Sequence, residues 1–340
     1  MIKVVVDGFG GDNAPVEVVK GVVSAINENS DLHIVITGKE DALNDELAKY
    51  TYNKEQVTVL HAESVITNDD VPTTAIRTKK DSSLVVAFDY AKANDDCVGL
   101  VSAGSTGAVL TGAFMKFGRL KGIHRPALCP ILPTKTGGVV GLCDSGANMD
   151  CKPEYLEQFA LMGSAYLKTI GVENPRVGLL NVGTEDHKGD TRTKESFELI
   201  KNLGDKINFV GNMEARDLLS GDYDLIVTDG FAGNVLLKST EGAIKNLLSI
   251  LKTEIKASFW SKIGALFMKK AFGNIKSKMD YNRHGGAVLL GCKKLLVKGH
   301  GSSKDTSIYA CINQVYKMSK GNLVENIAKE LETLGLDDNE

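Results

Sequence analysis

Short apolar runs alternate with amphipathic stretches along the first two thirds of the chain. The runs have the length of buried strands, and the stretches between them space apolar residues as helices do. Strands are expected at residues 2–6, 32–37, 57–60, 97–101, 176–182, 207–210 and 225–228, and helices at 15–27, 41–50, 82–94, 107–120, 153–170 and 194–203. Apolar strands separated by helices predict an α/β fold, with a largely parallel sheet covered on both faces.

Three regions depart from this alternation. Residues 125–133 and 139–143, joined by two glycines, predict an antiparallel hairpin, and residues 67–74 predict a polar loop that contains Pro72. From residue 235 the pattern is mainly helical, apart from a stretch rich in Gly and Val at 283–298. Because no linker divides the chain, residues 1–340 are expected to form one α/β catalytic domain, with 235–280 as a protruding helical segment.

Gly-rich polar loops follow five of the predicted strands. They span residues 7–12, 102–107, 144–148, 181–186 and 229–234, and another compact loop covers 300–303. The carboxyl ends of parallel strands meet at one edge of a sheet, where ligands bind, so we expect one shared site. The loop at 102–107 offers N–H groups and hydroxyls to an anion such as phosphate, although helix capping by Ser105 or Thr106 is the simpler alternative. The candidate residues for binding substrate or phosphate in these loops are Asp12, Gly104, Thr106, Gly107, Asn148, Thr184, Asp229, His300 and Ser302.

Composition and missing motifs narrow the class of function. The net charge of −3 gives no case for a nucleic-acid partner, and six cysteines without a CxxC pair indicate reduced core thiols of a cytosolic protein. Asn13 breaks the pattern G-x-G-x-x-G, and GxxxxGK[ST], HExxH and G-x-S-x-G are absent. No signal peptide, membrane span, metal or cofactor is therefore expected.

For Lys188 and Asn234 the sequence allows either an ordinary structural role or a role in the reaction. Lys188 follows the loop 181–186, where a lysine is either a solvated charge or a cation that neutralises phosphate. Asn234 stands at the start of a helix, where it either caps the helix or donates its amide to an oxygen of the substrate. His300 is either an ordinary loop histidine or a base.

The segment from Lys252 to Lys278 combines apolar and basic residues. Its aromatic and aliphatic side chains form an arc on a helical wheel, and lysines interleave with them. Such a segment suits contact with an anionic membrane surface, and packing on a partner subunit is the equal alternative. The residues expected to touch a membrane are Phe259, Trp260, Ile263, Leu266 and Phe267.

Taken together, the loops resemble the PlsX family of bacterial phosphate acyltransferases over nearly the whole chain. The motifs that carry the resemblance, in order, are Gly10-Gly11-Asp12, Ser102-Ala103-Gly104, Thr106-Gly107-Ala108, Arg125-Pro126-Ala127, Gly146-Ala147-Asn148, Lys152-Pro153-Glu154, Asn181-Val182-Gly183-Thr184-Glu185, Glu214-Ala215-Arg216-Asp217, Asp229-Gly230-Phe231, Gly233-Asn234, Gly285-Gly286-Ala287 and His300-Gly301-Ser302-Ser303. Three sites differ from the usual pattern of the family: Gly8-Phe9 replaces the common Ala-Met, Asn13 replaces His, and Ser105 replaces Asn.

The resemblance implies a fold, an activity and partners. The fold would be a three-layer αβα sandwich similar to isocitrate and isopropylmalate dehydrogenases. The family forms acyl phosphate from fatty acyl-acyl-carrier protein and inorganic phosphate in phospholipid synthesis, and its catalytic residues match Lys188 and Asn234. Members are cytoplasmic homodimers that associate peripherally with the inner face of the cell membrane, where a separate acyltransferase moves the acyl group to glycerol phosphate.

Direct attack of phosphate on the thioester is the expected mechanism. Lys188 and loop N–H groups would hold the phosphate, and Asn234 would stabilise the oxyanion. Three alternatives stay open at this point: a dehydrogenase on the same fold, a phosphotransacetylase-like enzyme that uses acyl-coenzyme A, and a scaffold at a membrane surface.

Overall fold

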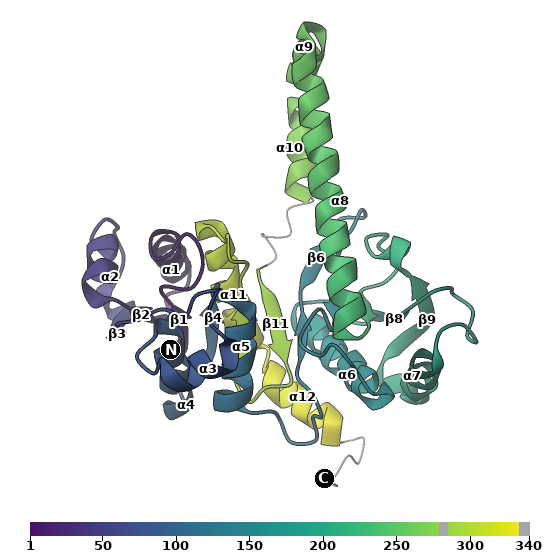
Figure 1. Cartoon of the computed structure of the whole chain (residues 1–340), viewed down its shortest axis with the longest axis horizontal. Coiled ribbons are helices and arrows are strands. Elements are labelled where there is room, and N and C mark those ends of the chain that lie inside the picture. Colours follow the sequence, from purple (N-terminus) through teal and green to yellow (C-terminus); the bar gives the residue numbers. More distant parts are fainter. Residues whose placement is uncertain (279–284, 333–340) are drawn as a thin grey trace.

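The protein, seen in a computed structural model that describes residues 1–278 and 285–332, has two sheets flanked by helices (Figure 1). The first sheet has the spatial order β3 (Val57–His61), β2 (Leu32–Gly38), β1 (Ile2–Asp7), β4 (Cys97–Ser102), β12 (Leu295–Lys298), β11 (Ala287–Leu290) and β5 (Ala127–Cys129). The second has the order β6 (Ile131–Pro133), β7 (Val139–Cys143), β10 (Leu225–Val227), β8 (Arg176–Asn181) and β9 (Asn208–Glu214).

The helices divide into those that cover the sheets and those that project from them. The covering helices are α1 (Val16–Glu28), α2 (Glu40–Leu47), α3 (Pro72–Thr78), α4 (Ser83–Ala93), α5 (Thr106–Gly112), α6 (Pro153–Thr169), α7 (Thr191–Asn202), α11 (Asp305–Lys320) and α12 (Leu323–Glu332). The projecting helices are α8 (Gly230–Ala257), α9 (Phe259–Phe267) and α10 (Lys269–Lys278).

Strand pairing confirms the α/β class and the predicted hairpin. Strand β1 pairs in parallel with β2 and β4, β12 with β4, and β8 with β9 and β10. Strands β6 and β7 pair in antiparallel fashion, as the hairpin prediction required. One feature differs from the prediction: the extended stretch 125–133 is divided between the two sheets. Its first part, β5, pairs with β11 in the first sheet, and its last part, β6, belongs to the second. Hydrophobic periodicity says nothing about which strands share a sheet, so the sequence predicted a single one.

Two segments differ locally from the sequence prediction. Pro72, expected in a loop, begins α3, where its missing N–H and fixed φ suit the first turn of a helix. The helix expected to reach residue 120 is shorter: α5 ends at Gly112, a single π-helical turn follows over Ala113–Phe117, and Gly118 then adopts a φ of 72°. A positive φ is easily adopted by glycine and ends a helix.

The two sheets share one apolar core. Helices α1 and α11 pack on one face of the first sheet, and α4 packs on the other against β1 and β4. Helix α6 packs on β7 and β10 of the second sheet and also contacts α11 and β11. A continuous cluster of buried side chains runs from Val4 and Ile34 in the first sheet to Val177 and Leu225 in the second. The carboxyl ends of the two sets of parallel strands are thereby held in a common framework.

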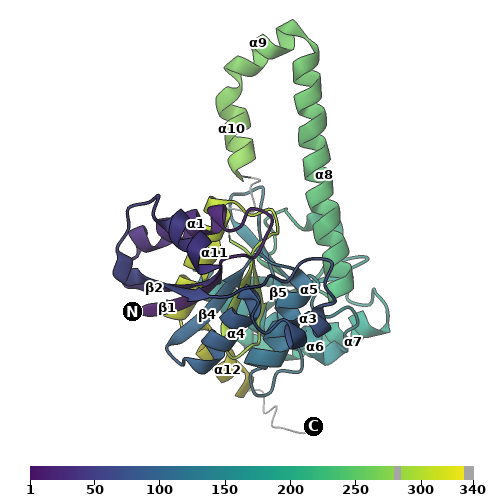
Figure 2. The same ribbon diagram turned by 60° about the vertical axis from the view of Figure 1, so that its left-hand side comes forward.

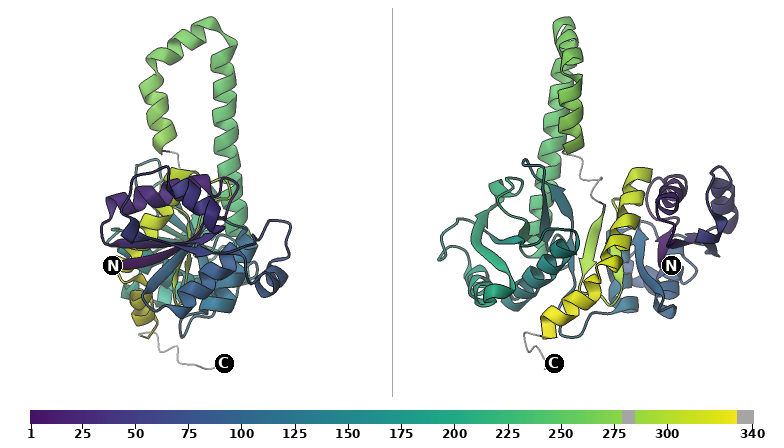
Figure 3. Two further views of the ribbon diagram at one scale, coloured as in Figure 1. Left: turned by 90° about the vertical axis from the view of Figure 1, so that its left-hand side faces the viewer. Right: turned by 180° about the vertical axis from the view of Figure 1, so that it is seen from behind.

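Helices α8 to α10 stand away from the sheets. Helix α8 rises from the second sheet, α9 turns at its tip, and α10 descends again (Figures 2 and 3). In α8 the only buried residues are Gly230 and Gly233, both in its first turn. The sequence extended this segment to residue 280, and residues 279 and 280 lie outside the described part of the chain. Among the described helices, none combines the length and hydropathy needed to cross a bilayer.

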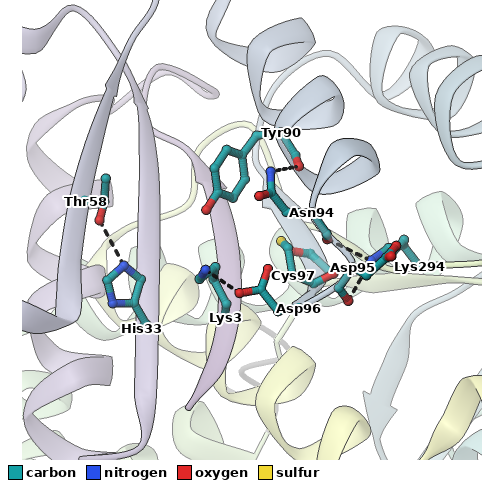
Figure 4. A network of polar contacts seen from close by, with 10 residues as sticks. Lys3, His33, Thr58, Tyr90, Asn94, Asp95, Asp96, Cys97 and Lys294 are labelled. Atoms are coloured by element: carbon teal, nitrogen blue, oxygen red, sulfur yellow. Dashed lines mark hydrogen bonds and ion pairs between the residues drawn. The ribbon is translucent and has the colours of Figure 1, made fainter.

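Structural polar contacts gather at the amino ends of the strands in the first sheet (Figure 4). Lys3 at the start of β1 forms an ion pair of 2.5 Å with Asp96, just before β4. Lys294, which precedes β12, donates hydrogen bonds of 2.7 to 3.2 Å to the backbone carbonyls of Asn94, Asp95 and Cys97. These contacts join β1, β4 and β12 at the amino ends of the strands. The candidate site residues lie at the opposite edge, where the strands have their carboxyl ends.

Candidate active site

The loop 144–148 is organised by one buried carboxylate. Asp144 accepts hydrogen bonds from the backbone N–H groups of Leu128, at 2.9 Å, and Asn148, at 2.6 Å, and also from those of residues 146 and 147. Burial raises the pKa of Asp144, and the N–H donors favour its charged form. The Asn148 amide donates to Asp144 and to the carbonyl of Pro126. The predicted phosphate contact Asn148 is therefore engaged in holding this loop.

The first turn of α8 packs directly on that loop. The Gly230 N–H donates to the Asn148 carbonyl at 2.7 Å, and a Cβ atom at Gly233 would lie 1.9 Å from the Asp144 carbonyl oxygen. Asn234 follows, and its Nδ2 donates to the Ser145 carbonyl at 3.1 Å. An amide group has two N–H donors, so one of them is left for a ligand.

Asp229, and not Asn234, caps this helix. One Asp229 oxygen accepts the N–H of Ala232 at 2.9 Å, and the other accepts a hydrogen bond of 2.8 Å from Arg192. The default role that the sequence offered for Asn234 therefore belongs to Asp229. Arg192, which sequence reasoning did not single out, neutralises the buried Asp229 carboxylate.

The first sheet contributes a second wall of polar groups. Buried Asp7 ends β1 and accepts a hydrogen bond of 2.7 Å from the hydroxyl of Ser102, which ends β4. The same hydroxyl accepts the N–H of Gly104 at 3.1 Å. Ser105 forms no side-chain capping bond at α5, so the capping alternative does not hold for this residue. Gly107 faces α3, because a Cβ there would lie 2.7 Å from a ring carbon of Pro72.

The loop 300–303 is held by its own histidine. The Ser302 N–H donates to His300 Nδ1 at 3.2 Å, and the Ser302 hydroxyl lies 2.9 Å from the same nitrogen. A backbone donor at Nδ1 leaves the proton of a neutral ring on Nε2. Gly301 accepts the backbone N–H of Asp12 at 2.8 Å, which joins this loop to the one after β1.

A cavity of about 230 Å³ lies between the ends of the two sheets. The first sheet supplies Thr106, Lys298 and His300, and the second sheet and α8 supply Ser145 and Asn234. Its apolar lining consists of Leu128, Pro130, Ile131, Leu132, Leu237 and Ala287. An adjoining cavity of about 460 Å³ is lined by Asp12, Gly104 and Thr106, and it shares Lys298, His300 and Gly301 with the first.

Lys298 is the residue of this site that the sequence analysis missed. It ends β12, is 8% exposed, and lines both cavities. Burial lowers its pKa to about 8. The available signal was a lysine that closes an otherwise apolar strand, directly before the Gly-His-Gly loop.

Lys188 and Thr184 lie apart from these cavities, on the loop after β8. Lys188 lines neither cavity, is 44% exposed at its side chain, and has its ammonium group 3.9 Å from the Glu185 carboxylate. The loop is fixed by the Asn181 amide, which donates to the Lys188 carbonyl at 3.1 Å, and by the Asn212 amide, which donates to the Glu185 carbonyl. The structure thus brings Asn234, Thr106 and His300 together, while the proposed partner Lys188 lies on a separate loop.

The arrangement favours binding and polarisation over covalent catalysis. The six cysteines are buried, and burial raises the pKa of Cys151 to about 11 and of Cys292 and Cys311 to about 12, so these three remain thiols at neutral pH. Ser145 donates its hydroxyl to the Leu128 carbonyl. What the cavity does offer is the buried Lys298, the ion pair of Lys238 with Glu241, neutral donors and an apolar lining.

The fold falls in a known α/β class. A phosphotransacetylase from Streptococcus pyogenes is similar in structure, with a TM-score of 0.63 at 16% identity and 94% of each chain covered. A 4-hydroxythreonine-4-phosphate dehydrogenase from Klebsiella pneumoniae gives a TM-score of 0.51 at 11% identity, covering 93% of this chain and 98% of its own. The class therefore includes both transferases and dehydrogenases, as the sequence predicted, and it leaves the activity open.

Sequence relatives decide between these activities. The family model described as a fatty acid synthesis protein matches residues 2–326. Phosphate acyltransferases of Clostridium tetani and Clostridium acetobutylicum are 48% and 46% identical over 331 and 332 residues, covering 97% of this chain and 98% and 99% of theirs. The chain belongs to the PlsX family of phosphate acyltransferases. It is an acyltransferase that uses phosphate.

Proposed function

We propose that this enzyme forms acyl phosphate by moving a fatty acyl group from the thioester of acyl-carrier protein to inorganic phosphate. One observation carries the proposal: a single cavity unites Asn234, Thr106, Lys298 and His300 with an apolar wall that includes Leu132 and Leu237. The polar side suits a phosphate next to a thioester carbonyl, and the apolar wall suits the first carbons of an alkyl chain.

The chemical step is a direct displacement. A phosphate oxygen attacks the thioester carbonyl carbon, and a tetrahedral oxyanion forms. The carbon–sulfur bond then breaks, acyl phosphate remains, and the carrier leaves as a thiolate that takes a proton from water. Because a thiol has a pKa of about 8.5, the leaving group needs little help from a general acid. The step therefore requires only that both substrates be held and that the oxyanion be stabilised.

Asn234 and Lys188 are the proposed catalytic residues. Asn234 is anchored through one N–H to Ser145 and donates the other to the oxyanion. Lys188 neutralises the phosphate, and the weak surface contact with Glu185 opposes its movement very little. Neither role requires a metal or an organic cofactor.

The identity of the acyl donor is decided by a single comparison. Purified enzyme is supplied with inorganic phosphate and either palmitoyl-acyl-carrier protein or palmitoyl-coenzyme A, and acyl phosphate is trapped as the hydroxamate. We expect the carrier-bound donor to give at least about a hundredfold higher kcat/KM, a difference of about 3 kcal/mol in transition-state binding. Preference for short acyl-coenzyme A would instead indicate a phosphotransacetylase-like enzyme, and absence of acyl phosphate would refute the proposal.

Replacing Asn234 with alanine is expected to lower kcat by about 10² to 10³, the usual loss on removal of one oxyanion donor. Steady-state rates of acyl phosphate formation measure this loss. Asn246→Ala is the matched control, because Asn246 lies exposed on the same helix. Unchanged kcat in Asn234→Ala, with folding verified by circular dichroism, would remove Asn234 from the mechanism.

We further propose that the tip formed by α9 is a peripheral membrane contact. Phe259, Trp260, Leu266 and Phe267 are 69% to 87% exposed there, and lysines such as Lys262 surround them. Aromatic side chains next to lysines suit an interface with anionic lipid. Such contact would place a cytoplasmic enzyme at the membrane, where a glycerol phosphate acyltransferase consumes acyl phosphate. A homodimer in which this segment packs on the partner subunit is the competing proposal.

Charge reversal separates these two proposals. We expect the triple variant Lys256→Glu, Lys262→Glu, Lys269→Glu to lose most binding to vesicles that contain phosphatidylglycerol, at about 1 kcal/mol for each lysine near the surface. Cosedimentation at physiological salt measures the bound fraction. A triple reversal of Lys194, Lys201 and Lys206, which lie on or just after α7, is the control. Unchanged vesicle binding in the first variant would favour packing on a partner subunit.

A further inference from the structure

Lys298 occupies an unusual place for a lysine. It ends a strand in the middle of the first sheet, is 8% exposed, and borders the two adjoining cavities at the carboxyl edge. Its ammonium group has three N–H donors, and the Gly299 carbonyl accepts one of them. Lysine is almost never buried without a partner, because removing its charge from water costs free energy.

No carboxylate among the described residues forms an ion pair with Lys298. Lys238, which lines the same cavity from α8, has such a partner in Glu241 at 3.0 Å. The nearby acid at the end of β1 is Asp7, and it is engaged by the Ser102 hydroxyl. The buried cation of the cavity is thus the one that lacks a fixed counter-ion.

The other charged and titratable groups around Lys298 do not supply that counter-ion. Asp12 lines the adjoining cavity and is exposed. His300 follows on the same loop, and its Nδ1 is engaged by Ser302. Cys311 faces Lys298 from α11, and burial raises its pKa to about 12, so it stays a neutral thiol. A small anion that enters the cavity would complete the pairing of the ammonium group.

We infer that Lys298 binds the phosphate substrate directly, as the buried cation of the acyl phosphate cavity. This inference rests on the proposed function and names a substrate-binding residue for it. Phosphate on Lys298 would lie in the same cavity as Asn234 and the apolar wall, so its oxygen could meet the thioester carbonyl. Lys188, from the loop after β8, would then close on the phosphate from the side of the second sheet.

If Lys298 binds phosphate, binding should be coupled to the uptake of protons by the protein. Burial lowers the pKa of Lys298 to about 8, and a bound anion favours the charged form and raises that pKa. At pH 8.5 phosphate binding should therefore take up a fraction of a proton, and the affinity should fall as pH rises from 7.5 to 9.5. Burial raises the pKa of Cys311 to about 12, so this thiol stays neutral across the range, and burial also raises the pKa of Asp7 above its usual value.

Calorimetry with inorganic phosphate tests the inference on the free enzyme. We compare wild type with Lys298→Met at pH 7.5 and 8.5, in two buffers of different ionisation enthalpy. Lys298→Met is expected to bind phosphate about tenfold to a hundredfold more weakly and to lose the proton uptake. Its thermal midpoint should equal or exceed that of wild type, because an apolar side chain replaces a buried unpaired charge.

Lys294→Met is the control, because it removes a lysine of the same sheet from the opposite edge. It should lose thermal stability, through its three carbonyl contacts, and keep phosphate affinity. Lys298→Met with wild-type phosphate affinity and a lowered midpoint would mean that Lys298 is structural and would overturn the inference. If that variant does not fold, absence of proton uptake by wild type at pH 8.5 overturns it, and uptake supports it.

The two proposals fail in different ways. If wild type makes acyl phosphate and Lys298→Met keeps the wild-type KM for phosphate, the assignment of Lys298 is wrong and the proposed function stands. If wild type binds phosphate through Lys298 but makes acyl phosphate from no thioester donor, the proposed function is wrong and the phosphate site stands.

Discussion

Lys188→Ala is expected to lower the rate of acyl phosphate formation by about 10³, close to complete loss of activity. The proposed transition state carries the charge of phosphate together with that of the new oxyanion, and a cation that meets this charge stabilises it more than the ground state. Hydroxamate trapping of the product under saturating acyl-carrier protein measures the rate. Lys188→Arg should recover part of it, because the charge remains while the geometry of the donor changes.

Lys194→Ala is the matched control for this variant, since Lys194 is exposed on α7, six residues further along the chain. It should leave the rate unchanged. Activity of Lys188→Ala within a few-fold of wild type would exclude Lys188 as a catalytic residue. Because Lys188 lines neither cavity and Lys298 lines both, that outcome would leave Lys298 as the cation that binds phosphate.

Gly233→Ala is expected to destabilise the fold by about 3 kcal/mol or more, the upper range for overpacking. The added Cβ would lie 1.9 Å from the carbonyl oxygen of Asp144, and that oxygen belongs to the backbone of a loop fixed by the buried carboxylate of the same residue. The loop can move only by losing those hydrogen bonds. Urea unfolding followed by circular dichroism measures the change.

Gly242→Ala on the same helix is the control. A Cβ at Gly242 meets no atom within 4 Å, and alanine has the higher helix propensity, so this variant should lose no stability. Equal unfolding midpoints for the two variants would mean that the first turn of α8 moves freely on the loop 144–148. The rigid placement of Asn234 next to the cavity would then have no structural basis.

The hydrophobic pattern predicted most of the elements because both faces of a central strand are buried. Runs such as Val4 to Val6 and Leu225 to Val227 are continuous for that reason, and the Gly-rich loops after them mark where strands end. The pattern was wrong where local chemistry competes with it. Pro72 indicated a loop but begins α3, and the helix after Thr106 ends early at a π-helical turn and Gly118.

The sequence revealed those candidate site residues that are polar and stand next to a glycine at the end of a predicted strand. Thr106, Asn234 and His300 stand in such loops and meet at one cavity. Lys298 was missed because it is the last residue of an apolar strand, where a lysine is usually a solvated strand end. Asp144 and Arg192 were missed for a different reason: their partners, the N–H groups of residues 146–148 and the Asp229 carboxylate, become visible only in three dimensions.

The sequence by itself determined the α/β class, the polar loops at the strand ends and the family, because each is written in local periodicity or in motifs of contiguous residues. Only the tertiary structure decided that the strands form two sheets and that the cavity lies between their carboxyl edges. It also decided that Lys298 shares this cavity with Asn234 while Lys188 lies on a separate loop. The physical reason is that burial and electrostatic pairing depend on distances between residues far apart in the chain, which hydrophobic periodicity does not encode.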